Sequence, residues 1–313
     1  MPSYSGVWNL NAVLQAVAAG NWPAPPLAGD IGLFGGGTGQ LNSIMYITIT
    51  STGNTTDFGD ATVNSTSRGS CASSTRAIWA GGHDSAVNVI DYVTIATVGN
   101  ATDFGDLLNA PYGMAGCSNS TRGVFAGGFS GSGLNVIQYV TIASVGNSTD
   151  FGDLTLTSYD NSACSSTTRG IWAGGNYNNN VIQYITIAST GDATDFGDLT
   201  LTRGNLAGCS SSTRGVFGGG FDSGFNRVNV IDYITIASTG NATDFGDLTV
   251  SRSDDGACSN STRGVFAGGN GASGNVNTID YITIASAGNA TDFGDTATTT
   301  KELMGCSNAH GGL

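Results

Sequence analysis

The pentapeptide Thr-Asp-Phe-Gly-Asp occurs six times in this chain, and its spacing constrains the fold more than any other feature. Its phenylalanines are Phe58, Phe104, Phe151, Phe196, Phe245 and Phe293, so that consecutive copies lie 45 to 49 residues apart. A period of that length is typical of architectures in which each repeat is one small antiparallel sheet. Because such a unit cannot bury its apolar face alone, the units are expected to pack against one another.

Each unit predicts four strands. Gly123–Gly128 (GVFAGG) reads as a short strand that ends in a glycine pair, and Asn135–Ser144 (NVIQYVTIAS) has the β-branched and aromatic residues of a longer one. A Gly-Asn turn signal within Val145–Gly152 precedes a third strand, and the stretch around Cys117 supplies the fourth. No helical period appears in the units, so we expect an all-β protein.

The two ends of the chain are complementary. The first unit opens with Gly32–Gly37 (GLFGGG), a second strand without its first, and the last stops after Met304–Gly312, a first strand without its second. Pairing them completes a sixth sheet and leaves no long exposed edge. We therefore predict a six-bladed β-propeller of four-stranded antiparallel blades over residues 31–313. Residues 1–30 form a short N-terminal extension.

The repeat resembles the kelch family of propellers. The resemblance covers residues 31–313 and rests on a hydrophobic pair, a glycine doublet, a Tyr on the next strand and an aromatic residue on the fourth, here Val124, Phe125, Gly127, Gly128, Tyr139 and Phe151. Phe stands where kelch repeats usually carry Trp. The resemblance implies the fold and leaves the function open.

A second resemblance concerns the extension. Ser5–Pro23 (SGVWNLNAVLQAVAAGNWP) is similar to the openings of bacteriophage tail and fibre proteins, and near-identical glycine-rich repeats resemble those of marine phage virion proteins. This implies a location in the virion after synthesis in the host cytoplasm. Trp8 and Trp22 then either pack on the propeller or dock into a larger particle, and docking is favoured because exposed aromatic side chains mark interfaces.

Charge narrows the partners. The net charge is −13 and the chain has only ten Lys and Arg, so it lacks the basic patch that nucleic-acid binding needs. No apolar run approaches the length of about 20 residues that spans a bilayer, so we expect no membrane insertion. Other virion proteins, a host-surface glycan or protein, and a second copy of the chain remain as partners.

One class of loop varies while every other spacing is fixed. All insertions fall between the glycine pair and the next repeat Tyr, on the face that also carries the crossovers between blades. Loops on a rigid scaffold usually carry recognition. The candidate binding residues on this variable face are Tyr112, Phe129, Tyr159, Tyr177, Asn178, Arg203, Phe221, Phe225 and Arg227. The alternative is that unselected loops drift and some of these rings merely cover blade edges.

Five arginines share one repeat position: Arg76, Arg122, Arg169, Arg214 and Arg263. We expect a structural role, in which each guanidinium pairs with a repeat aspartate such as Asp103 or Asp106. An anion-binding ring is the alternative. The unit built from both termini lacks this Arg.

The remaining side chains argue against cofactors and catalysis. Twelve of the 23 acidic residues are the paired aspartates of the repeat, for which turn capping is favoured over calcium binding. The six cysteines share one blade position and are expected to be free thiols. With two histidines and no catalytic motif, we expect neither a metal site nor an enzyme. The sequence thus favours a non-enzymatic phage structural or binding protein (tail, fibre or capsid decoration), with a cellular or secreted lectin-like propeller as the alternative.

Overall fold

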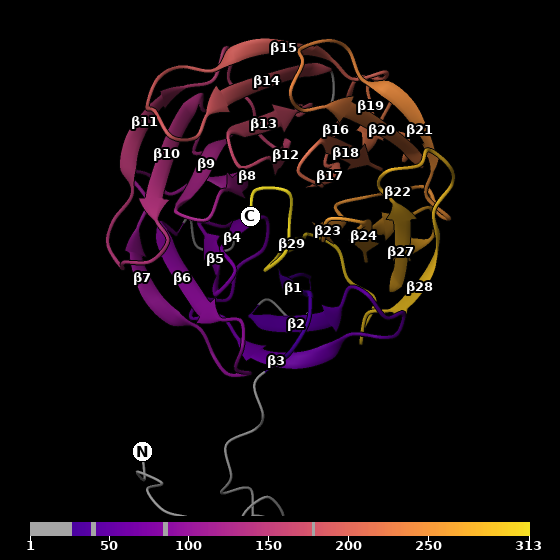
Figure 1. Ribbon diagram of the computed structural model, residues 1–313, viewed down its shortest axis with the longest axis horizontal. Coiled ribbons are helices and arrows are strands. Elements are labelled where there is room, and N and C mark those ends of the chain that lie inside the picture. Colours follow the sequence, from indigo (N-terminus) through magenta and orange to yellow (C-terminus); the bar gives the residue numbers. More distant parts are fainter. Residues whose placement is uncertain (1–26, 39–41, 84–86, 177–178) are drawn as a thin grey trace, which may run out of the picture.

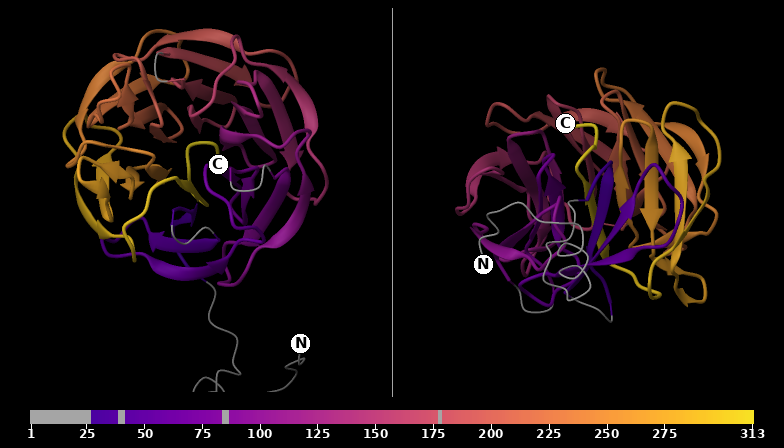
Figure 2. Two further views of the ribbon diagram at one scale, coloured as in Figure 1. Left: turned by 180° about the vertical axis from the view of Figure 1, so that it is seen from behind. Right: turned by 60° about the horizontal axis from the view of Figure 1, so that its bottom comes forward.

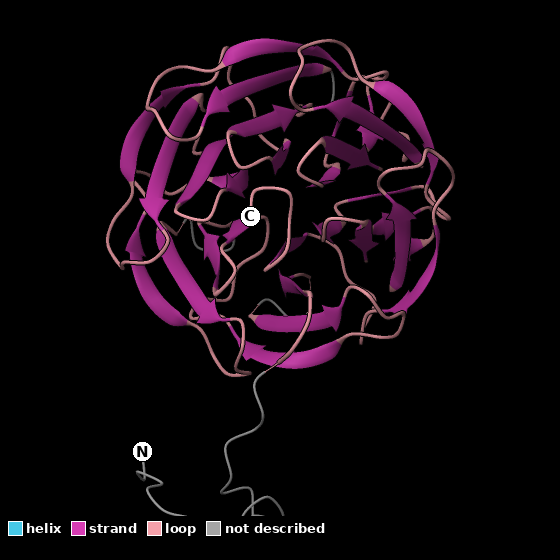
Figure 3. Ribbon diagram, viewed as in Figure 1, coloured by secondary structure: helices cyan, strands magenta, loops and turns pink. Residues whose placement is uncertain are grey.

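A computed structural model describes residues 27–38, 42–83, 87–176 and 179–313. Within these ranges every regular element is a strand and no helix occurs, which confirms the all-β prediction (Figure 3). The strands form six four-stranded antiparallel sheets and two small ones. The large sheets stand side by side around a central axis (Figure 1).

We number the large sheets I to VI and give their strands from the axis outward. Sheet I has β29 (Leu303–Ser307), β1 (Ile31–Gly36), β2 (Ser43–Thr48) and β3 (Thr56–Asp60); sheet II has β4 (Gly69–Ala72), β5 (Arg76–Ala80), β6 (Val89–Thr94) and β7 (Thr102–Asp106); sheet III has β8 (Tyr112–Ser118), β9 (Arg122–Phe129), β10 (Val136–Thr141) and β11 (Thr149–Asp153).

Sheet IV has β12 (Ser162–Ser165), β13 (Arg169–Ala173), β14 (Val181–Thr186) and β15 (Thr194–Asp198); sheet V has β17 (Ala207–Ser210), β18 (Arg214–Gly218), β20 (Val230–Thr235) and β21 (Thr243–Asp247); sheet VI has β23 (Gly256–Ser259), β24 (Arg263–Ala267), β27 (Thr278–Thr283) and β28 (Thr291–Asp295). The small sheets join β16 (Arg203–Gly204) to β19 (Phe221–Asp222), and β22 (Arg252–Ser253) to β25 (Asn270–Gly271) and β26 (Gly274–Asn275).

Sheet I is made from both ends of the described chain. β29 pairs antiparallel with β1, with Leu33 opposite Cys306 and Phe34 opposite Gly305. The expected pairing of the two half-units is therefore present. β29 also touches the innermost strands of sheets II and VI.

The core is distributed between the sheets. Six apolar clusters each combine residues of two neighbouring sheets, and one of them joins sheet VI to sheet I through Phe34, Val265 and Phe293. The repeat Tyr lies edge-on against the repeat Phe of its own sheet, as in Tyr139 and Phe151 with ring centroids 5.8 Å apart. The repeat strands are therefore largely buried, because each sheet is covered by its neighbours.

The repeated pentapeptide is explained by contacts between sheets. The backbone N–H of Gly191, in the Gly-Asp turn of sheet IV, donates to the Phe151 carbonyl of sheet III at 2.8 Å. The side chain of Asp192 then accepts from the Asp153 N–H at 3.0 Å. Equivalent pairs join all six neighbouring sheets, including Gly53 to Phe293 between sheets I and VI. We call this arrangement the outer clasp.

The start of the described chain lies against the large sheets. Leu27 N–H donates to the Ala96 carbonyl at 2.8 Å, and the Asp30 carboxylate accepts from Asn260 at 2.8 Å. The last four residues of the predicted extension thus contact sheets II and VI.

The other end of the chain covers the axis. After β29 the segment Asn308–Leu313 turns across the centre (Figures 1 and 2), where Gly311 N–H donates to the Ser210 carbonyl at 3.0 Å. The His310 ring accepts from Gly312 N–H through Nδ1, and its Nε2 lies 2.9 Å from the Ala72 carbonyl. Burial lowers the pKa of His310, which fits a neutral ring with its proton on Nε2.

Candidate functional site

The insertion-bearing loops and the crossovers lie together, as the sequence predicts. Tyr112, from the crossover into sheet III, lies edge-on against His83 of the β5–β6 loop, with ring centroids 4.6 Å apart. The opposite face holds the short turns, where Ile142 N–H donates to the Thr121 carbonyl at 2.9 Å. We keep the name variable face for the face that holds the insertion-bearing loops and the crossovers.

Four aromatic side chains of the variable face form a continuous row: His83, Tyr112, Phe129 and Tyr159. Successive ring centroids lie 4.6, 5.4 and 5.4 Å apart. His83 is exposed and the other three are half-buried. We call this set the aromatic row.

Regular structure holds the row in place. Tyr112 opens β8 and Phe129 closes β9, and the two residues are direct partners across the ladder. Tyr159 lies in the crossover, where its N–H donates to Asn176 Oδ1 at 2.9 Å. Half-exposed rings with phenol and imidazole groups offer both an apolar surface and hydrogen-bonding atoms.

A second group of candidates lies in the loop of sheet V. The Arg227 guanidinium lies 5.1 Å from the centre of the Phe221 ring, and the two residues form a β-bridge. Phe225, at the tip of this loop, is 66% exposed. The Asp222 carboxylate accepts from the N–H groups of Gly224 and Asn226, both at 2.8 Å. Hydrogen bonds from Asn226 lower the pKa of Asp222.

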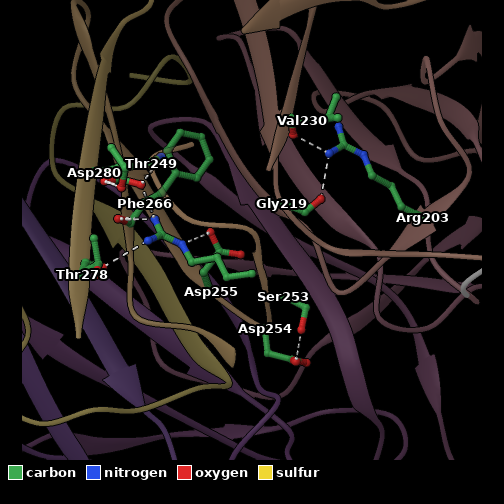
Figure 4. Close-up of polar contacts among 11 residues, drawn as sticks. Arg203, Gly219, Val230, Thr249, Ser253, Asp254, Asp255, Phe266, Thr278 and Asp280 are labelled. Atoms are coloured by element: carbon green, nitrogen blue, oxygen red, sulfur yellow. Dashed lines mark hydrogen bonds and ion pairs between the residues drawn. The ribbon is translucent and has the colours of Figure 1, made fainter. Parts of the chain in front are cut away.

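The prediction that Arg203 is a recognition residue is wrong. Its side chain is fully buried, where it pairs with Asp232 at 2.9 Å. It also donates to the carbonyls of Gly219 and Val230 (Figure 4). A guanidinium can satisfy several carbonyls and a carboxylate at once, and here it holds the loop of sheet V to the strands.

Sheets II and VI contain the same device. The Arg68 guanidinium lies 3.0 Å from Asp91, and that of Arg252 lies 3.2 Å from Asp280, with all four side chains buried. The aspartate always precedes the repeat Tyr. Sheets I, III and IV carry Met45, Gln138 and Gln183 at that position, and the described residues show no buried arginine beside them. This pairing could have been predicted from the sequence, because the buried Arg occurs in the units that carry Asp before the repeat Tyr. It was not predicted.

The expected pairing of the repeated arginines with repeat aspartates is also wrong. The Arg122 guanidinium lies 4.6 Å from the centre of the Tyr139 ring and donates to the Ile187 carbonyl of the next sheet at 3.0 Å. The other four stack and donate in the same way: Arg76 to Ile142, Arg169 to Ile236, Arg214 to Ile284 and Arg263 to Ile49. No described ion pair joins any of them to a repeat aspartate. Their role is a contact between sheets.

The innermost strands line a cavity of about 50 Å³ at the axis, which we call the axial channel. Ser118 Oγ donates to the Ala72 carbonyl at 2.7 Å, and Ser165, Ser210, Ser259 and Ser307 each donate in the same way to the preceding sheet. The six cysteines, one residue earlier in each sheet, are free and buried. Burial raises the pKa of every one of these thiols, that of Cys209 to about 12.

Several predicted residues lie outside the described ranges: Trp8, Trp22, Tyr177 and Asn178. In the described ranges no three His, Cys, Asp or Glu side chains converge as metal ligands. That the repeat aspartates cap turns and do not bind calcium stays a prediction. The described chain holds no helix long and apolar enough to cross a membrane.

No family model matches the chain, and no curated protein matches it.

Proposed function

We propose that this chain is a closed six-bladed β-propeller of the kelch type that acts as a non-enzymatic binding protein of a bacteriophage virion. The ring is supported by six large sheets, by apolar clusters between each neighbouring pair and by the joint sheet of β1 and β29. The virion setting rests on the resemblance of the extension and repeats to phage tail and fibre proteins.

The aromatic row carries the proposal of binding. Tyr112, Phe129 and Tyr159 stay half-exposed on the one face where loop length varies, whereas the outer clasp and the arginine contacts are repeated almost unchanged. Aromatic rings of this kind stack on the apolar face of a sugar or on the side chains of a protein. We infer that the row recognises a neutral glycan or a protein on the host surface, or another virion protein.

The same row fits the alternative, a cellular or secreted lectin-like propeller. The two hypotheses share the ligand chemistry and differ in where the protein resides. In the virion hypothesis, residues 1–30 with Trp8 and Trp22 dock into the particle or into a second copy of the chain. Mass spectrometry of purified particles separates the two, because a cellular lectin is absent from them.

Binding is tested with Tyr159→Ala on a glycan array and on whole host cells. We expect the variant to lose at least tenfold in affinity while its circular dichroism and melting temperature stay near those of the parent. Val145→Ala is the control, because it removes an exposed apolar side chain of the opposite face. Equal binding by Tyr159→Ala and the parent would overturn the role of the row. So would a folded parent that binds neither glycans, host cells nor virion proteins.

A further inference from the structure

At the variable-face end of the axis, a cavity is lined by six equivalent residues, one from each repeat unit. They are Ser67, Gly113, Asp160, Asn205, Asp254 and Glu302, each four residues before a channel cysteine. Backbone hydrogen bonds link them around the axis: each of the last five donates its N–H to the carbonyl of the one before it, at 2.6 to 2.9 Å. We call this set the channel rim.

All six rim residues have positive φ, from 53° to 65°. Glycine adopts this conformation at the least cost, and the chain uses glycine at its other repeated positions of positive φ. The rim nevertheless has side chains at five of its six positions, and these are five of the seven described non-glycine residues with positive φ. Such retained strain points to a use for the side chains.

The side chains around the rim are acidic. Asp160, Asp254 and Glu302 line a cavity of about 40 Å³ together with Asp255, which lies one residue below the rim. Lys301 pairs with Glu302 at 2.8 Å, and Arg252 contacts Asp255 at 3.5 Å but is shared with Asp280. Figure 4 shows Asp254 and Asp255, which follow one another in the segment between β22 and β23. Burial raises the pKa of both carboxyl groups, that of Asp255 to about 7.

Unpaired polar atoms lie at the same cavity. Asn161 lines it and is 8% exposed, and neither its amide nitrogen nor its oxygen has a hydrogen-bond partner. One oxygen each of Asp255 and Asn205, which also line the cavity, lacks a partner as well. Buried polar atoms cost free energy when left unpaired. Among these atoms three acceptor oxygens lack a donor, whereas one donor, the Asn161 amide nitrogen, lacks an acceptor.

We propose that the channel rim is a binding site for a primary alkylammonium group. An ammonium supplies three donors and one positive charge in the space of about one water molecule, which matches the excess of acceptors and carboxyl groups. A bare metal ion matches less well, because no three described carboxylate, His or Cys side chains converge as ligands. The group comes either from a free amine or from a lysine side chain of a docked protein.

The test measures dissociation constants by ligand-observed NMR on the full chain with n-butylammonium chloride, and with n-butanol as the neutral probe of the same shape. We expect saturable binding of butylammonium and none of butanol. The double variant Asp160→Asn, Asp254→Asn should weaken binding at least tenfold, since Asn tolerates positive φ but carries no charge. The control pair Asp103→Asn, Asp150→Asn removes two exposed repeat carboxylates instead and should bind like the parent.

Two further probes distinguish a free amine from the lysine side chain of a docked protein as the source of the ammonium group. Tighter binding of 1,5-diaminopentane assigns the site to free amines, whereas tighter binding of Nα-acetyl-lysine methylamide assigns it to a protein lysine. The proposal is overturned if butanol binds as well as butylammonium, if the rim and control variants behave alike, or if calcium chloride displaces butylammonium at lower concentration than either amine. Tyr159→Ala should leave amine binding unchanged, so failure here is distinct from failure of the aromatic row.

Discussion

At the scale of single residues, the arginines of this chain have two structural roles. Arg122 is half-buried and bridges two sheets through a ring and a carbonyl. Arg203 is fully buried and pairs with a carboxylate within one sheet. The free energy of unfolding that is lost on removing each arginine, or its partner, depends on which groups are then left unpaired.

For Arg122→Ala we expect a loss of about 1–3 kcal/mol in the free energy of unfolding, because a charge-assisted hydrogen bond and a cation–π contact disappear together. Arg122→Lys should recover only part, since an ammonium lacks the planar fork. Urea unfolding measures both, with the exposed Ser120→Ala as control. An unchanged midpoint for Arg122→Ala would show that the contact adds nothing.

For Asp232→Gln we expect a larger loss, about 3–5 kcal/mol, because Arg203 then stays buried without its carboxylate. The double variant Arg203→Ser, Asp232→Gln copies the Ser158 and Gln183 of sheet IV and should regain most of that loss. Denaturant unfolding of the single and double variants forms the cycle. If the double variant is no more stable than Asp232→Gln, the two residues are not coupled.

These residues also show which features could be predicted from the sequence and which could not. The strands, their order and the joint first sheet follow from spacing and β-branched composition, because each unit repeats one local pattern. The partner of Arg122 was mispredicted because turn position suggested Asp103 or Asp106, whereas the ladder sets Arg122 beside the Tyr139 strand. Arg203 lies in a variable crossover and so looked exposed. Its burial depends on Asp232, 29 residues away.

At the scale of elements, the outer clasp needs close backbone contact between a strand and the turn of the next sheet. A Cβ placed on Gly152 would lie 2.5 Å from the Gly191 carbonyl oxygen, whereas a Cβ on Gly191 meets nothing within 4 Å. Both residues have positive φ, 147° and 151°. Alanine substitutions at the two glycines therefore distinguish steric contact, which arises only at Gly152, from backbone strain, which arises at both.

Gly152→Ala should thus destabilise the protein by about 1–3 kcal/mol more than Gly191→Ala, because only the first forces neighbouring backbones apart. Both variants share the cost of positive φ for alanine, about 1 kcal/mol. Thermal and urea unfolding of the pair give the difference directly. Equal losses would mean that the turn of sheet IV moves away freely and that the clasp is loose.

At the scale of the whole molecule, the proposed closure of the ring depends on β29. This strand pairs with β1 and supplies Cys306 to the cluster between sheets I and II and Leu303 to the cluster between sheets VI and I. Removing residues 303–313 exposes the edge of β1 and opens two interfaces together. Exposed edges recruit other strands, so we expect aggregates or oligomers in place of a cooperatively unfolding monomer.

Removing residues 309–313 alone keeps β29 and should leave a folded protein, which makes it the control for the longer deletion. A synthetic peptide of residues 299–313 added to the longer deletion should restore the monomer, since strand addition supplies backbone hydrogen bonds and the two buried side chains. Size-exclusion chromatography and urea unfolding follow the recovery. A chain ending at residue 302 that stays a stable monomer without peptide would show that β29 is dispensable, and the proposal of a closed ring would fall with it.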